Sequence, residues 1–503
     1  MLVLGAASER SQAGGVTVIA HGFNSDVESW IIPMAEEIPG YAGFPGTQAG
    51  CYALEVTSKT APATLTKLAG AAPTVSDSGE ILIKLDWSAI DNFEGIFGLQ
   101  ATSTQVAQLA VNALTDAMIS ADTGGRPLVE LPLHLIGHSR GSSVVSEMAR
   151  LLGEQGIWVD QVTTLDPYPL PADGNVKTWE NVLYADNFWQ ELSGEVITGS
   201  SLAGAYNRKL TNLSGGYGSG HSDVHLWYHG TIDLATPATD TQATINASER
   251  TAWWTAGENG GANTGFLYSR LGGGDRLSTA APAGGAQVRA GFNGAWDLGG
   301  GLVANRQSLS VNGGLWPNVI RCQRGDSGSI AAGGTFPLAI HYQAGATAGG
   351  DVALTVLLDP DANPWNDNAF EIDAGTLAKT GPDAVSFVEI PVGTGSTPPG
   401  SYRVAARLTD GLNERILYAA TTIEITAGIP APAIQRETVR IEGGLMRFTI
   451  AGTAGQTVVV RAAENLTDWE VIASSTLVTG TWEFSDPDTA SYSARFYQVE
   501  AGP

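Results

Sequence analysis

The chain has 503 residues, more than one ordinary hydrophobic core accommodates, so about three domains are expected. It carries 51 Asp and Glu against 26 Lys and Arg, a net charge of −25 at pH 7. Such a surface repels nucleic acids and anionic membranes, so DNA and RNA are excluded as expected partners. No apolar run reaches the length of about 18 residues that a transmembrane segment needs, so none is expected.

Residues 16 to about 235 alternate short β-branched runs with longer helical patterns, which is typical of βαβ units. The predicted strands are 16–20, 80–85, 131–136, 158–165 and 181–185. The predicted helices are 27–38, 103–120 and one that begins at Ser142, with Ser103 or Thr104 as the N-cap of the second. This part of the chain is therefore predicted to form a mostly parallel sheet with helices on both faces.

The pattern changes after a Gly-rich region at 251–317. Short alternating runs follow, such as 351–358 and 402–408, and they indicate an all-β sandwich. A proline-containing hinge at 429–432 precedes another β segment, 437–499. The predicted fold class is multidomain: an α/β domain with a Gly-rich extension (1–317), an immunoglobulin-like β-sandwich (318–428) and a small β domain (429–503).

The sequence GHSRG at 137–141 lies between a predicted strand and a predicted helix, which is the context of a G-x-S-x-G nucleophile elbow. Both outer glycines are expected because the turn is too sharp for side chains. Ser139 is therefore the predicted nucleophile. The backbone N–H groups of Arg140 and of Phe23, which follows the first strand, are predicted to form an oxyanion hole. His21 is expected to hold the Phe23 loop by hydrogen bonding.

A serine hydroxyl is a poor nucleophile at neutral pH, so it needs a histidine base. Residues 220–229 contain His221, His225 and His229, and the side chains of Val224, Trp227, Tyr228 and Ile232 mark one face of a predicted helix. His221 is favoured because it precedes a helix that Ser222 or Asp223 would cap. His225 is the alternative, although it and His229 are expected to be partly exposed helix residues.

The base in turn needs a carboxylate that fixes its tautomer. Asp166 ends one predicted strand, and Asp186 ends the next. Side chains at the carboxyl ends of parallel strands face the crevice where ligands bind, so this geometry alone leaves both candidates open.

These motifs, in this order, resemble the lipases of the α/β-hydrolase superfamily, most closely the pancreatic-type lipases and their bacterial relatives. The resemblance covers about residues 15–235, and it rests on HGF at 21–23, DW at 86–87, GHSRG, LDPYP at 165–169 and the segment around His221. It implies Asp166 rather than Asp186 as the acid and His221 rather than His225 as the base. The implied activity is that of a serine esterase or lipase, acting through an acyl-enzyme on esters of apolar acyl groups, without a cofactor.

Two features depart from this family. Arg140 stands where leucine is common, so its cationic side chain is a candidate for contact with the substrate. The segment between Asp166 and His221 is a candidate lid or acyl-binding wall. It is rich in aromatic residues, namely Tyr184, Phe188, Trp189, Tyr206 and Tyr217.

Other interpretations stay open at this point. The same triad serves an amidase or a thioesterase, and the β-rich tail also fits a binding or targeting protein for glycan or polymer. The last segment resembles C-terminal β-modules of exported bacterial proteins. This implies an extracellular, cell-surface or periplasmic location, with lipid, polymer or cell-surface glycan as a partner. Residues 1–7 are too short and lack the basic residues of an export signal, although they fit the remnant of one.

The sequence gives little sign of a metal centre. Cys51 and Cys322 are too few and too far apart for a zinc site or a disulfide scaffold, and whether they pair is left open. Asp359, Asp361 and Asn363 imitate the start of a calcium loop, but a proline replaces its glycine and a phenylalanine its final glutamate. An EF-hand is therefore excluded, and a structural calcium of another kind is the remaining prediction.

Overall fold

The computed structural model describes residues 14–41, 50–69, 80–95, 98–120, 123–211, 213, 215–232, 253, 265–268, 305–312, 314–325, 328–343, 351–361, 363–378, 386–428 and 431–502. The N-terminal segment, most of the Gly-rich region and residues 429–430 of the hinge lie outside this range. The chain forms two compact units, Met1–Ile330 with Gly334–Ile425 and Ala331–Gly333 with Thr426–Pro503. The first unit therefore contains both the predicted α/β domain and the predicted β-sandwich.

The first unit is built on an eight-stranded sheet in the order β10-β9-β8-β7-β1-β4-β2-β3. All neighbouring pairs are parallel except the antiparallel pair β2–β3, so the sheet is mixed but mostly parallel, as predicted. The strands β2, β3 and β10 are additional to those predicted. The strands are β1 Gly15–Ala20, β2 Gly50–Glu55, β3 Thr64–Ala69, β4 Glu80–Asp86, β7 Leu133–His138, β8 Val159–Leu165, β9 Val182–Gln190 and β10 Tyr206–Leu210.

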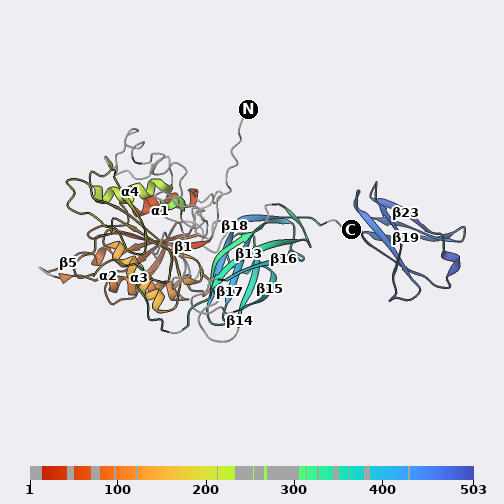
Figure 1. Ribbon diagram of the computed structural model, residues 1–503, viewed down its shortest axis with the longest axis horizontal. Coiled ribbons are helices and arrows are strands. Elements are labelled where there is room, and N and C mark those ends of the chain that lie inside the picture. The colour runs from red at the N-terminus through yellow and green to blue at the C-terminus, as the bar shows by residue number, and fades with distance from the viewer. Residues whose placement is uncertain are drawn as a thin grey trace, which may run out of the picture. The chain divides into compact units, whose positions relative to one another are not determined.

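Helices cover both faces of this sheet, which confirms that prediction. They are α1 Ile31–Tyr41, α2 Ser103–Thr115, α3 Gly141–Glu154 and α4 Gly220–Ile232. Figure 1 shows α1 and α4 on one side and α2 and α3 on the other. Successive strand side chains point to opposite faces. Accordingly Val16 and Val18 of β1 pack in the core that contains α2 and α3, and Ile19 packs in the core that contains α1 and α4.

Helix ends were predicted less well than helix positions. Thr102, not Ser103 or Thr104, caps α2, because its hydroxyl accepts from the Gln105 N–H in a capping box. The same helix ends at Thr115, and Met118, predicted on its buried stripe, is 81% exposed.

The β part of the first unit contains a three-stranded sheet, β11-β13-β16, and a five-stranded sheet, β12-β18-β17-β14-β15. The predicted runs 351–358 and 402–408 form β14 and β17. The strands are β11 Asn318–Arg324, β12 Ile330–Ala331, β13 Thr335–Gln343, β14 Asp351–Asp359, β15 Phe370–Ala378, β16 Ser386–Gly393, β17 Gly400–Thr409 and β18 Glu414–Thr426.

Arg415 on β18 joins this β part to the large sheet. Its guanidinium is buried, donates to the Val129 carbonyl at 2.7 Å and pairs with the Asp160 carboxylate at 2.6 Å. Because Asp160 lies on β8, the β part and the sheet that carries the predicted site share a buried ionic contact.

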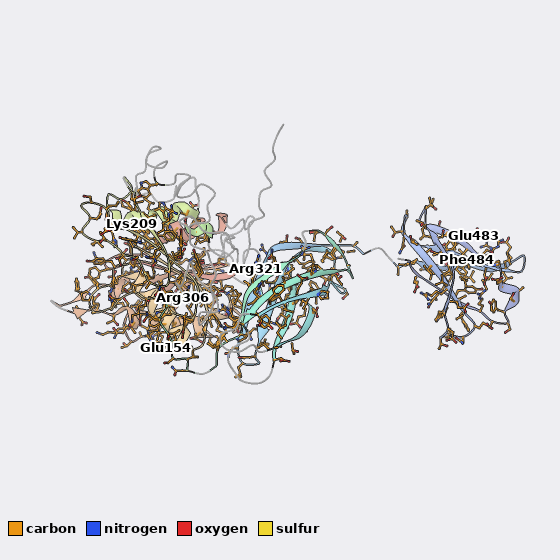
Figure 2. All side chains as sticks on the ribbon, viewed as in Figure 1. Glu154, Lys209, Arg306, Arg321, Glu483 and Phe484 are labelled. Carbon is orange, nitrogen blue, oxygen red and sulfur yellow. The ribbon has the colours of Figure 1, made fainter. Side chains whose placement is uncertain are left out.

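The second unit also consists of two small sheets, β19-β20-β23 and β22-β21-β24, as predicted for a C-terminal β domain. The neighbouring Glu483 and Phe484 of β23, labelled in Figure 2, alternate between solvent and the unit's own core. The strands are β19 Ala433–Glu442, β20 Leu445–Ala451, β21 Thr457–Ala463, β22 Glu470–Thr476, β23 Thr481–Asp486 and β24 Phe496–Ala501.

Two further expectations concern the whole chain. Within the part of the chain that the structure describes, no helix is long and apolar enough to cross a membrane. Cys51 and Cys322, whose pairing the sequence left open, are both buried, and they do not form a disulfide with each other.

Candidate active site

The predicted nucleophile lies at a sharp turn between β7 and α3. Ser139 has a φ of 54°, a left-handed conformation that is strained for a residue with a side chain. A Cβ on Gly137 would lie 2.4 Å from the Gly141 carbonyl oxygen, and one on Gly141 would lie 2.5 Å from the Ala20 and His21 carbonyl oxygens. The turn therefore requires glycine at both outer positions, as the sequence predicted.

Asp166 and His221 form a hydrogen-bonded pair. His221 Nδ1 donates to Asp166 Oδ2 at 2.6 Å, and the carboxylate is fully buried. Asp166 also accepts from the backbone N–H groups of Gln190, at 2.8 Å, and Gly199, at 3.0 Å, and from the Gln190 side chain at 3.0 Å. These bonds hold the carboxylate in one orientation. Because Nδ1 of His221 is bonded to Asp166, Nε2 is the ring nitrogen that remains available to accept a proton.

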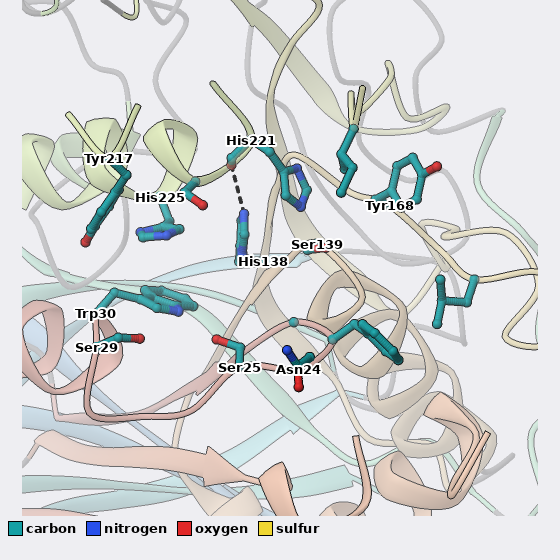
Figure 3. A pocket seen from close by; sticks show the side chains of 15 residues that line it. Asn24, Ser25, Ser29, Trp30, His138, Ser139, Tyr168, Tyr217, His221 and His225 are labelled. Atoms are coloured by element: carbon teal, nitrogen blue, oxygen red, sulfur yellow. Dashed lines mark hydrogen bonds between the residues drawn. The ribbon is translucent and has the colours of Figure 1, made fainter. Parts of the chain in front are cut away.

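Ser139 and His221 line the same pocket, which has a volume of about 320 Å³ (Figure 3). His138, the residue before the nucleophile, donates from Nε2 to the His221 carbonyl at 2.9 Å. Burial lowers the pKa of His138 well below its usual value, so the ring is neutral. The elbow is thereby tied directly to the backbone of the predicted base.

The surroundings of His221 differ from the expectation in one respect. Helix α4 begins at Gly220, so His221 lies in its first turn and neither Ser222 nor Asp223 is the N-cap. The Asp223 N–H instead donates to the Ser219 carbonyl at 2.9 Å, and its carboxylate accepts from the Tyr217 N–H at 2.7 Å. The carboxylate thus organises the loop that precedes the helix.

The alternative acid, Asp186, lies elsewhere. Strand β9 continues to Gln190, so Asp186 lies within the strand rather than at its end. Its carboxylate is buried and accepts from the Thr163 hydroxyl at 2.5 Å. Between the two candidates, Asp166 is the one that contacts His221.

The alternative base, His225, lies one turn further along α4 than His221. It is 4% exposed and His229 is 1% exposed, so the expectation that both are partly exposed was wrong. The cause is tertiary, because this helix is enclosed on the sheet by α1 and neighbouring loops.

The predicted oxyanion loop lies close to the nucleophile. A Cβ on Gly22 would lie 2.9 Å from Ser139 Cβ and 3.3 Å from its Oγ, so only glycine fits there. Within the described residues, neither the Phe23 nor the Arg140 backbone N–H donates to a protein acceptor. Both groups are thus free to bind a developing oxyanion.

His21 holds this loop, as expected. Its Nδ1 donates to the Gly22 carbonyl at 2.9 Å, and its Nε2 accepts from the Trp87 N–H at 3.2 Å. The Trp87 indole donates to the His21 carbonyl at 3.3 Å and its ring stacks on the imidazole. Trp87 of the DW motif, directly after β4, therefore supports the predicted oxyanion loop.

The Arg140 side chain does not reach the pocket, so the suggestion that it contacts the substrate was wrong. The residue is completely buried and pairs with Asp173 at 2.6 Å. It also donates to the Asp91 and Ala101 carbonyls and lies 4.8 Å from the centre of the Trp87 ring. With its guanidinium bonded to these acceptors, Arg140 is not among the residues that line the pocket beside Ser139.

The aromatic residues suggested as a lid are mostly part of the sheet. Tyr184 and Phe188 on β9 and Tyr206 on β10 are buried, and only Tyr217 of the suggested set lines the pocket. Other parts of the intervening segment, including Leu170 and Ile197, do form its wall.

The predicted calcium ligands are engaged with their own loop. Asp359 accepts from the Asp361 N–H at 2.9 Å and from the Tyr418 hydroxyl, and Asp361 accepts from the Asn363 N–H at 3.0 Å. The described residues contain no group of three or more His, Cys, Asp or Glu side chains that could hold a metal ion. A calcium site stays a prediction from the sequence.

Comparisons with known proteins add little to this picture. No family model and no curated protein matches the chain. Similar solved structures include dimeric latent PorU from Porphyromonas gingivalis, with 15% identity over 37% of this chain and 17% of that chain and a TM-score of 0.15. A β-glucosidase involved in saponin metabolism from intestinal bacteria has 10% identity over 84% of this chain and 51% of that one, with a TM-score of 0.16. Values this low carry no argument about fold or activity, so function is argued from the site.

Proposed function

We propose that this protein is a serine carboxylic-ester hydrolase whose first unit has an α/β-hydrolase fold. The observation that carries the proposal is the buried Asp166–His221 pair in the pocket that also holds Ser139 at a strained, glycine-flanked turn. The two free N–H groups beside Ser139 support it, because an ester hydrolase needs donors where negative charge develops.

In the proposed reaction, Ser139 Oγ attacks the ester carbonyl carbon while His221 Nε2 accepts the hydroxyl proton. The N–H groups of Phe23 and Arg140 bind the resulting oxyanion. The tetrahedral intermediate collapses, and His221 returns the proton to the leaving alcohol. Water then attacks the acyl-enzyme by the same route, which releases the carboxylic acid and restores the Ser139 hydroxyl.

The other interpretations of this chain concern the bond that is cleaved and the role of the β part. A triad of this kind also cleaves amides and thioesters, so these substrates belong in the same assay. Retention on a glycan or polymer and a location outside the cytoplasm are separate proposals, which rest on the resemblance of the tail alone.

The test is hydrolysis of p-nitrophenyl butyrate together with labelling by a fluorophosphonate, followed by intact mass. The wild type should hydrolyse the ester and gain one adduct, and Ser139→Ala should do neither. Ser474→Ala, at an exposed serine on β22 of the second unit, is the matched control and should behave as wild type. Full activity of Ser139→Ala, or a wild type that neither turns over nor is labelled, would refute the proposal. A butyranilide and a butyryl thioester assayed in parallel establish which bond is preferred.

A further inference from the structure

One side of the pocket carries aromatic rings together with imidazole and hydroxyl groups, whereas a wall that binds only an acyl chain would be apolar. Trp30, His225, Tyr217 and Ser29 lie on one side of Ser139, and Tyr168 lies on the other (Figure 3). We call the first group, together with Ser25, the polar arm. It combines flat rings with hydrogen-bonding groups, so it is suited to more than the burial of an alkyl chain.

The imidazole of His225 forms the centre of the polar arm. It stacks on Trp30 at 4.4 Å between ring centres and contacts Tyr217 at 5.0 Å and His138 at 4.7 Å. Its burial lowers its pKa well below the usual value, with smaller contributions from the nearby histidines. The ring is therefore neutral, with one nitrogen as a donor and the other as an acceptor.

The ring nitrogens of His225 lack a hydrogen-bond partner among the described residues. Although the residue is 4% exposed, neither nitrogen makes a hydrogen bond to any residue that the structure describes. The same holds for the indole N–H of Trp30, which is 3% exposed and also lines the pocket. These ring nitrogens are not among the fully buried unpaired atoms of the described residues, and both side chains line the pocket, so water or a ligand in the pocket can reach them. These groups therefore define a place where a bound molecule gains hydrogen bonds.

The charge of the pocket limits what that molecule is. Among the described residues that line it there is no Lys, Arg, Asp or Glu, so a charged group would lose its hydration without an ionic partner. A hydroxyl group, by contrast, both donates and accepts, which matches a neutral imidazole beside an indole N–H and serine hydroxyls. The volume of about 320 Å³ lies at the small end for ligand sites, so the bound group is short.

We propose that His225 and Trp30 form a subsite that selects esters in which the acyl or the alcohol half is short, uncharged and hydroxylated. This proposal depends on the proposed ester hydrolase activity, because Ser139 lines the same pocket as His225 and Trp30. His225 is then a binding residue and takes no part in the proton transfers.

The experiment compares matched esters that differ by one hydroxyl group. p-Nitrophenyl 3-hydroxybutyrate against p-nitrophenyl butyrate tests the acyl half, and 2-hydroxyethyl butyrate against ethyl butyrate tests the alcohol half. In the wild type, the hydroxylated member of one pair should have a kcat/KM about tenfold higher, the value of one good hydrogen bond. The quantity to compare between variants is this ratio, which is independent of the amount of active protein.

His225→Phe keeps a ring of similar shape but removes both nitrogens, so the ratio should fall to about one. His225→Gln restores a donor and an acceptor and should recover part of it. Trp30→Phe removes the indole N–H together with part of the ring surface stacked on His225, and it should lower the ratio separately, which tests the subsite even if His225→Phe does not fold. His341→Phe, at a histidine on β13 outside the pocket, is the matched control and should keep the wild-type ratio.

The two proposals fail in different ways. Wild-type hydrolysis without a hydroxyl preference in either pair, or a preference that survives in both His225→Phe and Trp30→Phe, would overturn the subsite and leave the esterase standing. A wild type that cleaves none of the esters and is not labelled by the fluorophosphonate would overturn the hydrolase and the subsite together.

Discussion

The buried Arg140 provides a test of the packing behind the elbow. In Arg140→Met the aliphatic volume is largely kept, but the bonds to Asp173, Asp91 and Ala101 are lost. The Asp173 carboxylate would then remain buried with the Ser103 N–H, at 2.8 Å, as its remaining donor among the described residues.

The expected cost follows from this geometry. Removing one partner of a buried ion pair costs about 3–5 kcal/mol, because the other charge stays desolvated. The matched control is Arg150→Met on the same helix. Arg150 pairs with Glu147 at 2.9 Å and Glu154 at 2.6 Å, but its side chain is 22% exposed. Solvent-screened pairs contribute about 0–1 kcal/mol, so Arg140→Met should lose about 2–5 kcal/mol more than Arg150→Met.

The assay is urea unfolding followed by tryptophan fluorescence, since Trp87 lies under the Arg140 guanidinium. The two units can unfold separately, so the comparison uses the same transition in each variant. Adding Asp173→Asn to Arg140→Met removes the unpaired charge and should restore about 1 kcal/mol or more. If Arg140→Met is no less stable than Arg150→Met, or if the double variant gains nothing, the ion pair behind the elbow does not stabilise the fold as argued.

Four further predictions concern the triad, the second unit and two other buried charged side chains. Asp166→Asn should lower kcat on p-nitrophenyl butyrate by about 10⁴-fold by disturbing the His221 tautomer, and a rate near wild type would contradict the proposed triad. Removing residues 426–503, which belong to the second unit, should leave esterase activity unchanged. Arg415→Met should destabilise the first unit by about 3–5 kcal/mol in urea unfolding, because Asp160 would stay buried without its partner. A stability of Arg415→Met equal to that of the wild type would contradict a shared core. Burial raises the pKa of Glu80 from 4.5 to about 8, although the hydrogen bond from Thr17 opposes this shift. The contribution of Glu80 to the free energy of unfolding is therefore complete below pH 4.5 and is lost as the pH rises towards 8. Glu80→Gln should flatten that decline in urea unfolding between pH 5 and pH 8, and an unchanged slope would contradict the assignment.

Local patterns in the sequence were sufficient for much of the fold. Strand periodicity and helical stripes placed the large sheet and its helices, because these patterns record which face of each element is buried. GHSRG at 137–141 indicated the turn, because a turn this sharp leaves no room for a side chain at either of its two glycines. The strands β2, β3 and β10 lacked a sufficiently distinct local pattern, and helix ends depended on single hydrogen bonds such as the Thr102 cap.

The tertiary structure decided between side chains that strand and helix position alone leave equivalent, although the family resemblance had already favoured Asp166 and His221. Asp166 and Asp186 look alike along the chain, but a φ of 44° turns the chain at Asp166, whereas β9 continues past Asp186. The direction of the Arg140 side chain depended on acceptors from three distant segments, and the enclosure of His225 depended on Trp30 and Tyr217. Sequence patterns encode the burial of a residue's own element, whereas these contacts join residues far apart in the chain, and only the packed structure brings them together.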